Sequence, residues 1–507
     1  MFASVPSATI LGAEGYPVVV EVHVGGGLPA FSMVGLPDES CREARDRVRA
    51  AIESTDRSWP QKRIVVNLAP PRHRKVGSGL DLAMAVGVLV AAGDIEPTAV
   101  RGLGFVGELG LDGSVRGVPG VAPMVGVLGE LDVVVPVASL AEARVAARAG
   151  VRPVAHLSEV IAALTAEAPW PDHDESTTTA PHDQVPDLAD VRGQPVPRRA
   201  LEIAAAGGHH LLFVGPPGSG KTMLAQRLPG ILPPLDRETA LRSTMVHSAA
   251  GIPLPPGGLV RRPPFRSPHH TSSLVSIVGG GSSAMRPGEA SIAHGGVLLL
   301  DELGEFPVGV LDALRQPLEE GAIHVARANS RAVLPARFLL VGATNPCPCG
   351  GGAPGECQCD DVRRQRYLRR LSGPLLDRFD LRVAVHRPGI DELIDGRGGE
   401  SSAIVARRVE RARAISNERG PLNGQLTGAE LDRWAPLSDG ARARLRHEME
   451  RGRLSGRGYH RIRRVARTLA DLDPEPVEIV SESHVVEALS LRTRLGSSVG
   501  SAPERVA

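Results

Sequence analysis

Aromatic residues and lysines are scarce in this chain of 507 residues. It contains three Trp, three Tyr and eight Phe, too few for base stacking on aromatic side chains to be its main way of binding single strands. Its lysines are limited to Lys62, Lys75 and Lys221, so nearly all of its cations are arginines. GC-rich coding explains such a bias, but each lysine retained against it is worth inspecting. The formal net charge of +1 excludes a uniformly basic, histone-like surface.

Long apolar runs and dispersed cysteines are also missing. The longest apolar run, at 82–93, is shorter than the roughly 18 residues that a membrane-spanning helix needs. The first residues lack the basic region and apolar core of a secretory signal. Four of the five cysteines lie in one short segment, which is typical of a metal site in a reducing compartment rather than of a disulfide framework. The sequence therefore predicts a cytoplasmic protein without membrane contact.

Four regions differ in composition, consistent with about three domains for this length. Residues 1–165 mix β-rich and helical stretches, which predicts an α/β domain. Residues 166–190 carry seven acids and four prolines but no Lys or Arg, which predicts a linker. Residues 191–395 alternate apolar strands with helical stretches, the pattern of a parallel α/β sheet. Residues 396–507 are helical in composition.

The helical C-terminal region is strongly basic in part. Residues 401–470 contain sixteen Arg against seven acidic residues. The near-neutral total charge thus combines an acidic linker with a basic C-terminal region. The excess is either a solvated helix surface or a surface that faces phosphates, and composition leaves both open.

A phosphate-binding loop is the strongest signal in the sequence. An apolar run at 210–214 precedes it and a helical stretch follows it, which is the strand–loop–helix context that the G-x-x-x-x-G-K-[ST] pattern requires. The glycines let backbone N–H groups turn towards phosphate oxygens. The lysine reaches the β- and γ-phosphates of ATP, and the threonine hydroxyl binds Mg²⁺. The residues of this loop are Gly215, Pro216, Pro217, Gly218, Ser219, Gly220, Lys221 and Thr222.

Two further strands supply the residues that hydrolysis needs. The apolar run at 297–300 ends in Asp301 and Glu302, which predicts a Mg²⁺ ligand followed by the base that activates the attacking water. Exposed acids at the end of an ordinary strand are the alternative, but the upstream loop favours the catalytic interpretation. A third strand, at 338–341, leads to Asn345, which could orient the same water. The sequence therefore predicts ATP hydrolysis rather than binding alone.

A cysteine cluster directly follows Asn345. Its spacing is Cys-x-Cys-x₇-Cys-x-Cys, with Gly and Pro between the pairs. Four thiolates can close a tetrahedral structural zinc site, although Cys-x-Cys is tighter than the usual Cys-x-x-Cys, and a reduced loop without metal is the alternative. The four residues are Cys347, Cys349, Cys357 and Cys359. Cys41 stands apart and is predicted to be inert.

These motifs together resemble the magnesium-chelatase-like branch of the AAA+ ATPases. Three strings, at 263–273, 286–303 and 345–350, resemble the ComM/YifB family in particular. The resemblance covers essentially the whole chain. It implies a Lon-protease-like N-terminal domain, a parallel-sheet AAA+ core and a C-terminal helical lid of the magnesium-chelatase type.

The resemblance also implies roles for individual residues. Asn345 would be the sensor that contacts the γ-phosphate, and Arg378 the arginine finger that reaches the ATP of a neighbouring subunit, so a homo-hexamer is implied. A surface ion pair with Asp377 or Asp380 is the alternative for Arg378. In the lid, Arg457 would be the second sensor, with Arg461 as its competitor.

Two further segments of the family pattern carry candidate ligands. The segment 322–335 resembles the hairpin that lines the pore of such rings, and its Arg327 and Arg331 could contact DNA phosphates. A solvent-exposed charged hairpin is the alternative. His269 and His270 lie in the first family string but have no cysteine nearby, so they are weak metal candidates.

The N-terminal domain departs from the Lon pattern at its active site. A Lon-type peptidase needs a serine that a downstream lysine activates. Ser78 lies near the expected serine but not on it, and the next lysine after Lys75 is Lys221, which belongs to the phosphate loop. Arginine stays protonated and cannot replace it. We therefore expect no protease activity, but a ring-forming or recognition module.

The implied function is that of an ATP-driven motor on DNA. The family resemblance implies branch migration during recombination of imported single-stranded DNA, with single-stranded and branched DNA bound largely without regard to sequence. ATP and Mg²⁺ would be its cofactors, with zinc as a further candidate. The alternative is the motor subunit of a chelatase that inserts Mg²⁺ into a porphyrin, although the chain lacks an integrin-like metal-binding segment.

Overall fold

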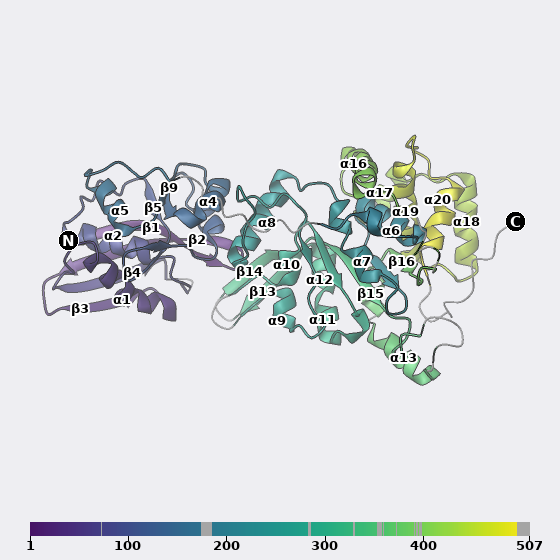
Figure 1. Ribbon diagram of the computed structural model, residues 1–507, viewed down its shortest axis with the longest axis horizontal. Helices are drawn as coiled ribbons and strands as arrows, with labels where there is room; N and C mark the ends of the chain where they lie inside the picture. The colour runs from purple at the N-terminus through teal and green to yellow at the C-terminus, as the bar shows by residue number, and fades with distance from the viewer. Residues whose placement is uncertain are drawn as a thin grey trace.

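The computed structural model describes most of the chain. The described residues are 1–71, 74–173, 185–281, 285–327, 330–351, 357, 359–371, 373–389, 391, 394 and 398–493. Of the linker expected at 166–190, residues 174–184 thus lie outside them. Figure 1 shows an elongated molecule with the N-terminal elements at one end, a parallel sheet in the middle and the C-terminal helices at the other end. No described helix has both the length and the apolar character needed to cross a membrane.

The N-terminal residues form two small α/β layers. In the first, the strand order is β1-β2-β4-β3, and alternate side chains of β2 are buried, as expected for a strand with one face on a core. Helix α2 is buried at eleven of its twelve positions because it is apolar on all sides. The elements are β1 (Phe2–Leu11), β2 (Glu14–Gly25), β3 (Ala30–Val34), α1 (Glu39–Glu53), β4 (Arg63–Ala69) and α2 (Asp81–Ala92).

The second N-terminal layer is a three-stranded parallel sheet in the order β5-β8-β9. Short helices connect its strands, and a two-stranded ribbon precedes them. Its elements are β5 (Leu103–Phe105), β6 (Glu108–Leu109), β7 (Val115–Arg116), α3 (Val121–Val127), β8 (Asp132–Pro136), α4 (Leu140–Ala146), β9 (Val151–Val154) and α5 (Leu157–Leu164).

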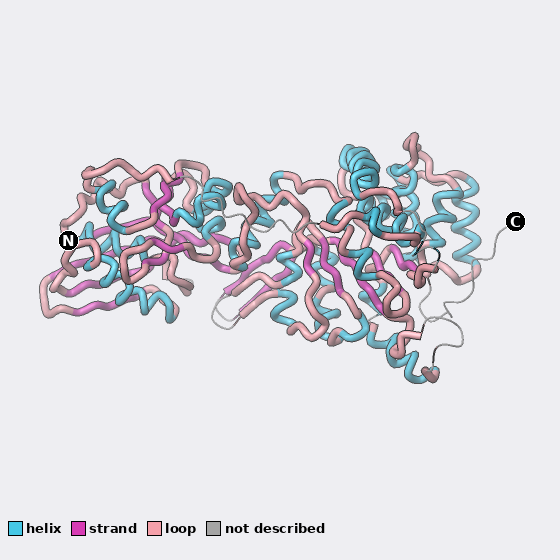
Figure 2. The backbone as a smooth tube through the Cα atoms, in the orientation of Figure 1, coloured by secondary structure: helices cyan, strands magenta, loops and turns pink. Residues whose placement is uncertain are grey.

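The central sheet has five parallel strands in the order β11-β12-β15-β10-β16. Figure 2 shows these strands lying between helices on both sides. Strands β10, β12 and β15 are buried at every position, which explains their continuous apolar sequences. The strands are β10 (Leu211–Val214), β11 (Phe265–Arg266), β12 (Val297–Leu300), β15 (Leu339–Thr344) and β16 (Leu381–Ala384). This confirms the predicted mixed α/β chain with a central parallel sheet.

Helices and one hairpin surround the central sheet. The antiparallel hairpin β13–β14 pairs Ala322 with Pro335, where the sequence predicts such a hairpin. The helices are α6 (Pro195–Gly207), α7 (Lys221–Ala225), α8 (Arg237–Ala250), α9 (Leu274–Val278), α10 (Glu289–Ile292), α11 (Val308–Ala313), α12 (Arg315–Glu320), α13 (Asp361–Arg370) and α14 (Gly373–Leu376). The hairpin strands are β13 (Ala322–Arg327) and β14 (Ser330–Pro335).

The C-terminal helices share one apolar core with α6 and strands β10 and β16. Part of their arginine excess points inward. Arg463 is 4% exposed and donates to the Leu431 and Ala435 carbonyl oxygens, and Arg467 is 1% exposed and pairs with Asp471 at 2.8 Å. The helices are α16 (Ser402–Arg419), α17 (Gly428–Trp434), α18 (Asp439–Glu450), α19 (Gly456–Leu472) and α20 (Glu482–Ser490).

The N-terminal layers contact the central region through α3 and α4 and through the turn between β1 and β2. The Glu142 carboxylate accepts hydrogen bonds from the Ser248 hydroxyl at 2.6 Å and from the Ala122 backbone N–H at 3.3 Å, which joins α4 and α3 to α8. Burial raises the pKa of Glu142. The turn between β1 and β2 lies on β14, since a Cβ added at Gly12 would meet Leu334 at 2.9 Å.

Candidate nucleotide site

The phosphate loop connects the carboxyl end of β10 to α7. Gly218 and Gly220 have φ values of 74° and 91°, in the left-handed region that glycine adopts without a Cβ clash. Gly215 is needed for space, because a Cβ there would lie 2.1 Å from the Val385 carbonyl oxygen. The loop backbone at Gly215 thus lies against the chain just after β16.

Lys221 lies inside this loop. Its ammonium donates hydrogen bonds to the carbonyl oxygens of Gly215 and Pro216, both at 2.8 Å, and to the Asn345 side-chain oxygen at 3.3 Å. Burial lowers its pKa, and the charges of Asp301 and Glu302 oppose that shift. The loop therefore holds one cation beside the three predicted polar residues that follow β12 and β15.

Thr222 and Asp301 meet at the mouth of the loop. The Thr222 hydroxyl donates to an Asp301 carboxylate oxygen at 2.5 Å. Magnesium prefers hard oxygen ligands and usually takes only one or two from the protein, with water and phosphate oxygens supplying the rest. A hydroxyl and a carboxylate side by side next to a phosphate loop fit Mg²⁺ bound with ATP.

Glu302 follows Asp301 in a constrained backbone conformation. Its φ is 51°, which costs a non-glycine residue free energy and is frequent at functional sites. The side chain is 55% exposed, and one carboxylate oxygen lies 2.9 Å from Nδ1 of His270. The sequence singles out His270 only as a weak metal candidate and does not predict this contact.

The predicted arginine finger lies at the opposite end of the sheet. Arg378 precedes β16, which runs parallel to β10 with Leu381 opposite Leu211, whereas the phosphate loop follows the other end of β10. Strands of this length span about 13 Å. Arg378 therefore does not meet Lys221 within this chain.

Charged side chains of α12 and α19 lie around Arg378. Arg378 pairs with Glu319 of α12. The alternative to an arginine finger was a surface ion pair of Arg378 with Asp377 or Asp380, and among the described residues its ion-pair partner is Glu319 instead. Those aspartates contact Arg461 at 3.8 and 3.6 Å, and Arg457 lies 3.8 Å from Asp377. Burial, with Arg461, Arg315 and Arg457 nearby, lowers the pKa of Arg378. Both candidates for the second sensor, Arg457 and Arg461, thus lie beside Arg378 and not beside Lys221.

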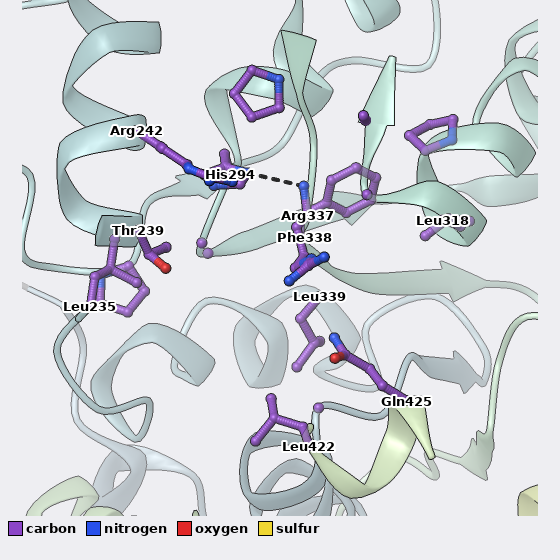
Figure 3. Close-up of a pocket in the computed structure, with 18 of the residues that line it drawn as sticks. Leu235, Thr239, Arg242, His294, Leu318, Arg337, Phe338, Leu339, Leu422 and Gln425 are labelled. Atoms are coloured by element: carbon purple, nitrogen blue, oxygen red, sulfur yellow. Dashed lines mark hydrogen bonds between the residues drawn. The ribbon is translucent and has the colours of Figure 1, made fainter. Parts of the chain in front are cut away.

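A cavity of about 1530 Å³ opens at this same end of the sheet. Its wall includes Arg378, Arg464 and part of α8, and Figure 3 shows Arg242, His294, Arg337 and Gln425 around it. The His294 ring accepts a hydrogen bond from the Arg337 backbone N–H at 3.1 Å. Burial lowers the pKa of His294 to about 4, so the ring is neutral at pH 7. The phosphate loop does not line this cavity.

The four clustered cysteines converge. Their sulfur atoms all lie within 4.8 Å of one another, and three of the separations are 3.3, 3.4 and 3.7 Å. Ligands of a tetrahedral zinc with bonds of about 2.3 Å are about 3.8 Å apart. Cysteines 347, 349, 357 and 359 can therefore hold a metal ion without a large rearrangement.

The remaining predicted residues are more scattered. Arg331 is exposed on β14, and Arg327 ends β13, with its side chain outside the described residues. In the N-terminal region, the Ser78 hydroxyl donates to Glu108, and the Lys75 ammonium donates to the Pro70 carbonyl oxygen. These partners differ from those of a serine–lysine pair, in which the serine hydroxyl faces the lysine.

Three family models match the chain. Residues 187–393 match "Magnesium chelatase, subunit ChlI", residues 20–139 match "Subunit ChlI of Mg-chelatase", and residues 399–492 match "Magnesium chelatase, subunit ChlI C-terminal". These ranges include the phosphate loop, Asp301, Glu302 and Arg378 in the first and Arg457 in the last.

Several known proteins are similar over nearly the whole chain. The uncharacterized protein Rv2897c of Mycobacterium tuberculosis is 44% identical over 499 residues, 96% of this chain and 97% of its own. The uncharacterized protein YifB of Salmonella typhimurium is 41% identical and competence protein ComM of Haemophilus influenzae 40% identical, each covering 97% of both chains. The probable DNA helicase MCM9 of Arabidopsis thaliana is 23% identical over 213 residues, 42% of this chain and 27% of its own.

Proposed function

Since the chain belongs to the ComM/YifB family of magnesium-chelatase-like AAA+ ATPases, we propose that it is a hexameric motor that migrates branched DNA. The substrates would be single-stranded and branched DNA in recombination, including DNA imported during natural transformation. The observation that carries the proposal is the separation of Lys221 and Arg378 to opposite ends of one parallel sheet, which suits an ATPase completed by a neighbouring subunit. The name of the MCM9 relative, a probable DNA helicase, supports DNA as the substrate.

The residues at the phosphate loop suit ATP hydrolysis. Lys221 and the loop amides would bind the phosphates, and the Thr222 hydroxyl and the Asp301 carboxylate would hold Mg²⁺, which would offset charge on the phosphate oxygens. Glu302 takes a proton from water as the water oxygen bonds to the γ-phosphorus. The bond from that phosphorus to the β-bridging oxygen breaks, and ADP leaves. Asn345, bonded to Lys221 at 3.3 Å, orients the water from the neighbouring strand.

The arginines at the other end of the sheet would serve the next subunit. Arg378 would stabilise the charge that develops on the γ-phosphate of a neighbour's ATP. Arg457, which lies 3.8 Å from Asp377, would act on the same phosphate as the lid sensor, and Arg461, whose side chain is 12% exposed, is its competitor. In this arrangement a single subunit lacks part of its catalytic site, so hydrolysis depends on the ring.

Two arginines of the hairpin are the proposed DNA contacts. Arg331 lies exposed on β14, and Arg327 is the last residue of β13. We expect single-stranded and branched DNA to increase ATP turnover, and the affinity for DNA to fall about 10³-fold between 50 and 200 mM salt if the ring makes about six phosphate contacts. Steady-state phosphate release and fluorescence anisotropy measure both.

A matched pair of variants tests the hairpin. Arg331→Ala should weaken DNA binding and flatten the salt dependence, whereas Arg101→Ala, an exposed arginine of the N-terminal layers, should not. If neither single-stranded nor branched DNA changes ATP turnover, and neither binds the protein at 50 mM salt, the DNA motor is excluded.

The chelatase motor is the second candidate, because all three matching family models carry the name of a magnesium chelatase subunit. It would drive Mg²⁺ insertion into a porphyrin through partner subunits. Under this alternative DNA leaves turnover unchanged, so the same assay separates the two functions.

The N-terminal and C-terminal regions would keep the roles that the family resemblance implies. Residues 1–165 would form a Lon-protease-like module for ring formation or recognition, without peptidase activity. Residues 396–507 would form the helical lid.

Zinc is the proposed occupant of the cysteine cluster. The four sulfur atoms lie within 4.8 Å of one another, and four protein ligands leave no open position for chemistry, so the ion would brace the loop after Asn345. We expect one zinc per chain in elemental analysis of the purified protein. Cys347→Ser and Cys359→Ser should lose it, and Cys41→Ala, a buried cysteine outside the cluster, should retain it. Metal-free protein with all four thiols titratable would contradict this assignment.

A further inference from the structure

Two consecutive histidines hold the segment that carries Arg378. His209 and His210 lie between the end of α6 and the start of β10. The carbonyl oxygen of His210 accepts hydrogen bonds from the backbone N–H groups of Asp380 and Leu381, at 3.1 and 3.2 Å. These bonds fix the chain at the start of β16, two residues beyond Arg378, against the start of β10.

The His209 ring connects this segment to the C-terminal helices. Its Nδ1 lies 3.0 Å from Oδ2 of Asp380, and its Nε2 lies 2.8 Å from the Thr468 hydroxyl of α19. Burial raises the pKa of Asp380, but the hydrogen bond from His209 and the charge of Arg464 oppose that effect, and the pKa lies below its usual range. The carboxylate is therefore ionised at pH 7 and can only accept, so Nδ1 of His209 donates to it.

The three bonded side chains are enclosed. His209 and Thr468 are 0% exposed, and Asp380 is 5% exposed. Gly207 leaves the space for the contact, because a Cβ added there would overlap both Nε2 of His209 and the Thr468 hydroxyl. Breaking either bond would leave a buried polar group without its partner, which is costly. The ring therefore holds Asp380 and α19 at a fixed separation.

The second carboxylate oxygen of Asp380 also faces α19. Oδ1 lies 3.6 Å from Nε of Arg461, so α19 holds one oxygen through His209 and the other through its own side chain. The same helix carries Arg457, the proposed second sensor. A shift of α19 therefore acts on the segment that contains Arg378.

We propose that His209 is a positioning residue, which ties Asp380 to Thr468 and thereby keeps Arg378 aligned with α19. The role rests on the proposed function, in which Arg378 acts on the ATP of a neighbouring subunit. His209 lies at the amino end of β10, whereas the phosphate loop follows the carboxyl end of that strand. Its loss should therefore slow hydrolysis without weakening ATP binding.

Removing the imidazole tests this separation. For His209→Ala we expect kcat to fall about 10²-fold, the order expected when a catalytic group is misplaced by about 1 Å, with the Kd for ATP unchanged. His209→Asn, whose amide can take the place of Nδ1 and donate to Asp380, should retain more turnover than His209→Gln, whose amide takes the place of Nε2. Phosphate release and titration with a fluorescent ATP analogue measure both quantities. Wild-type kcat in His209→Ala would overturn the role.

The hydroxyl at the other end of the ring has its own test. Thr468→Val keeps the volume but removes the hydroxyl, and should lower kcat about tenfold, the order expected for one lost hydrogen bond. Thr468→Ser keeps the hydroxyl and should retain turnover. His484→Ala is the matched control, because His484 is a buried histidine of the C-terminal helices whose aspartate partner, Asp473 at 2.9 Å, lies in the same region. An equal loss of kcat in His484→Ala would contradict a specific role for His209.

Mixed rings show whether His209 acts through Arg378. His209→Ala subunits should have an intact phosphate loop but a misplaced finger, so an equal mixture with Lys221→Ala subunits should recover about one quarter of wild-type turnover. A mixture with Arg378→Ala subunits should stay inactive, because neither subunit supplies a working finger. Recovery with Arg378→Ala instead would show a damaged phosphate loop, and recovery with neither partner would show a general loss of folding. Each of these two results would overturn the positioning role.

The two proposals fail in different ways. Wild-type protein that ignores DNA, combined with recovery in the mixture of His209→Ala and Lys221→Ala, would remove the DNA motor and leave the positioning role in place. Recovery in the mixture of Arg378→Ala and Lys221→Ala, without recovery when His209→Ala replaces Arg378→Ala, would remove the positioning role and leave the ring in place. If both mixtures stay inactive, the finger does not cross between subunits and both proposals are overturned.

Discussion

Lys221→Ala is expected to abolish ATP hydrolysis, lowering turnover by at least about 10²-fold, and to weaken ATP binding. The Lys221 ammonium is the cation inside the phosphate loop, where it donates to the carbonyl oxygens of Gly215 and Pro216. No other lysine can take its place, because Lys62 and Lys75 lie in the N-terminal layers. Phosphate release and titration with a fluorescent ATP analogue measure the two effects.

Lys62→Ala is the control for this variant. Lys62 is exposed and lies just before β4, so its removal should leave both turnover and thermal unfolding unchanged. Wild-type turnover in Lys221→Ala would contradict the nucleotide site, while a lowered unfolding temperature in that variant would show that the loop itself had been damaged.

Local sequence patterns predict which residues meet at the candidate nucleotide site. The loop glycines, the apolar strand before them and the acids after β12 are each short-range features, and parallel strands bring their carboxyl ends to one edge. Asn345 and Lys221, separated by 124 positions, meet at 3.3 Å for this reason. A strand pattern therefore carries enough information to predict which of these residues come together.

Contacts between loops are not predictable in the same way. His270 and Glu302 come from loops that follow β11 and β12, and their 2.9 Å contact depends on how the first loop folds over Phe306. Likewise, the pairing of Arg378 with Glu319 depends on where α12 lies. No spacing rule fixes such positions, so the sequence singles out His270 without indicating its partner.

Composition is a still weaker guide to the basic C-terminal region. Its arginine excess suggests a phosphate-facing surface as one of two alternatives, yet Arg467 is buried against Asp471 and Arg408 pairs with Glu202 and Glu400. Buried cations require such partners because an unpaired charge is costly away from water. These arginines stabilise the helical packing, and charge counting could not separate them from the exposed ones.

Arg378→Ala is expected to lower ATP turnover by about 10³-fold or more, as loss of an arginine finger does, while ATP binding is retained. Turnover should fall while ATP binding is retained because Arg378 lies at the amino end of β16, whereas the phosphate loop lies at the carboxyl end of β10. Arg242→Ala is the matched control, because Arg242 lines the same cavity but pairs with Glu238 of its own helix at 2.6 Å. It should retain turnover.

Mixing the two inactive variants distinguishes a finger in trans from a structural arginine. In a ring that combines Arg378→Ala and Lys221→Ala subunits at random, roughly one quarter of the junctions join an intact phosphate loop to an intact Arg378. Turnover should therefore recover to about that fraction of the wild-type value if junctions act independently. If Arg378 served only its own subunit, through its contact with Glu319, no junction would be complete and the mixture would stay inactive. Recovery in the mixture therefore depends on the finger crossing between subunits, which is the step that makes a ring necessary for hydrolysis.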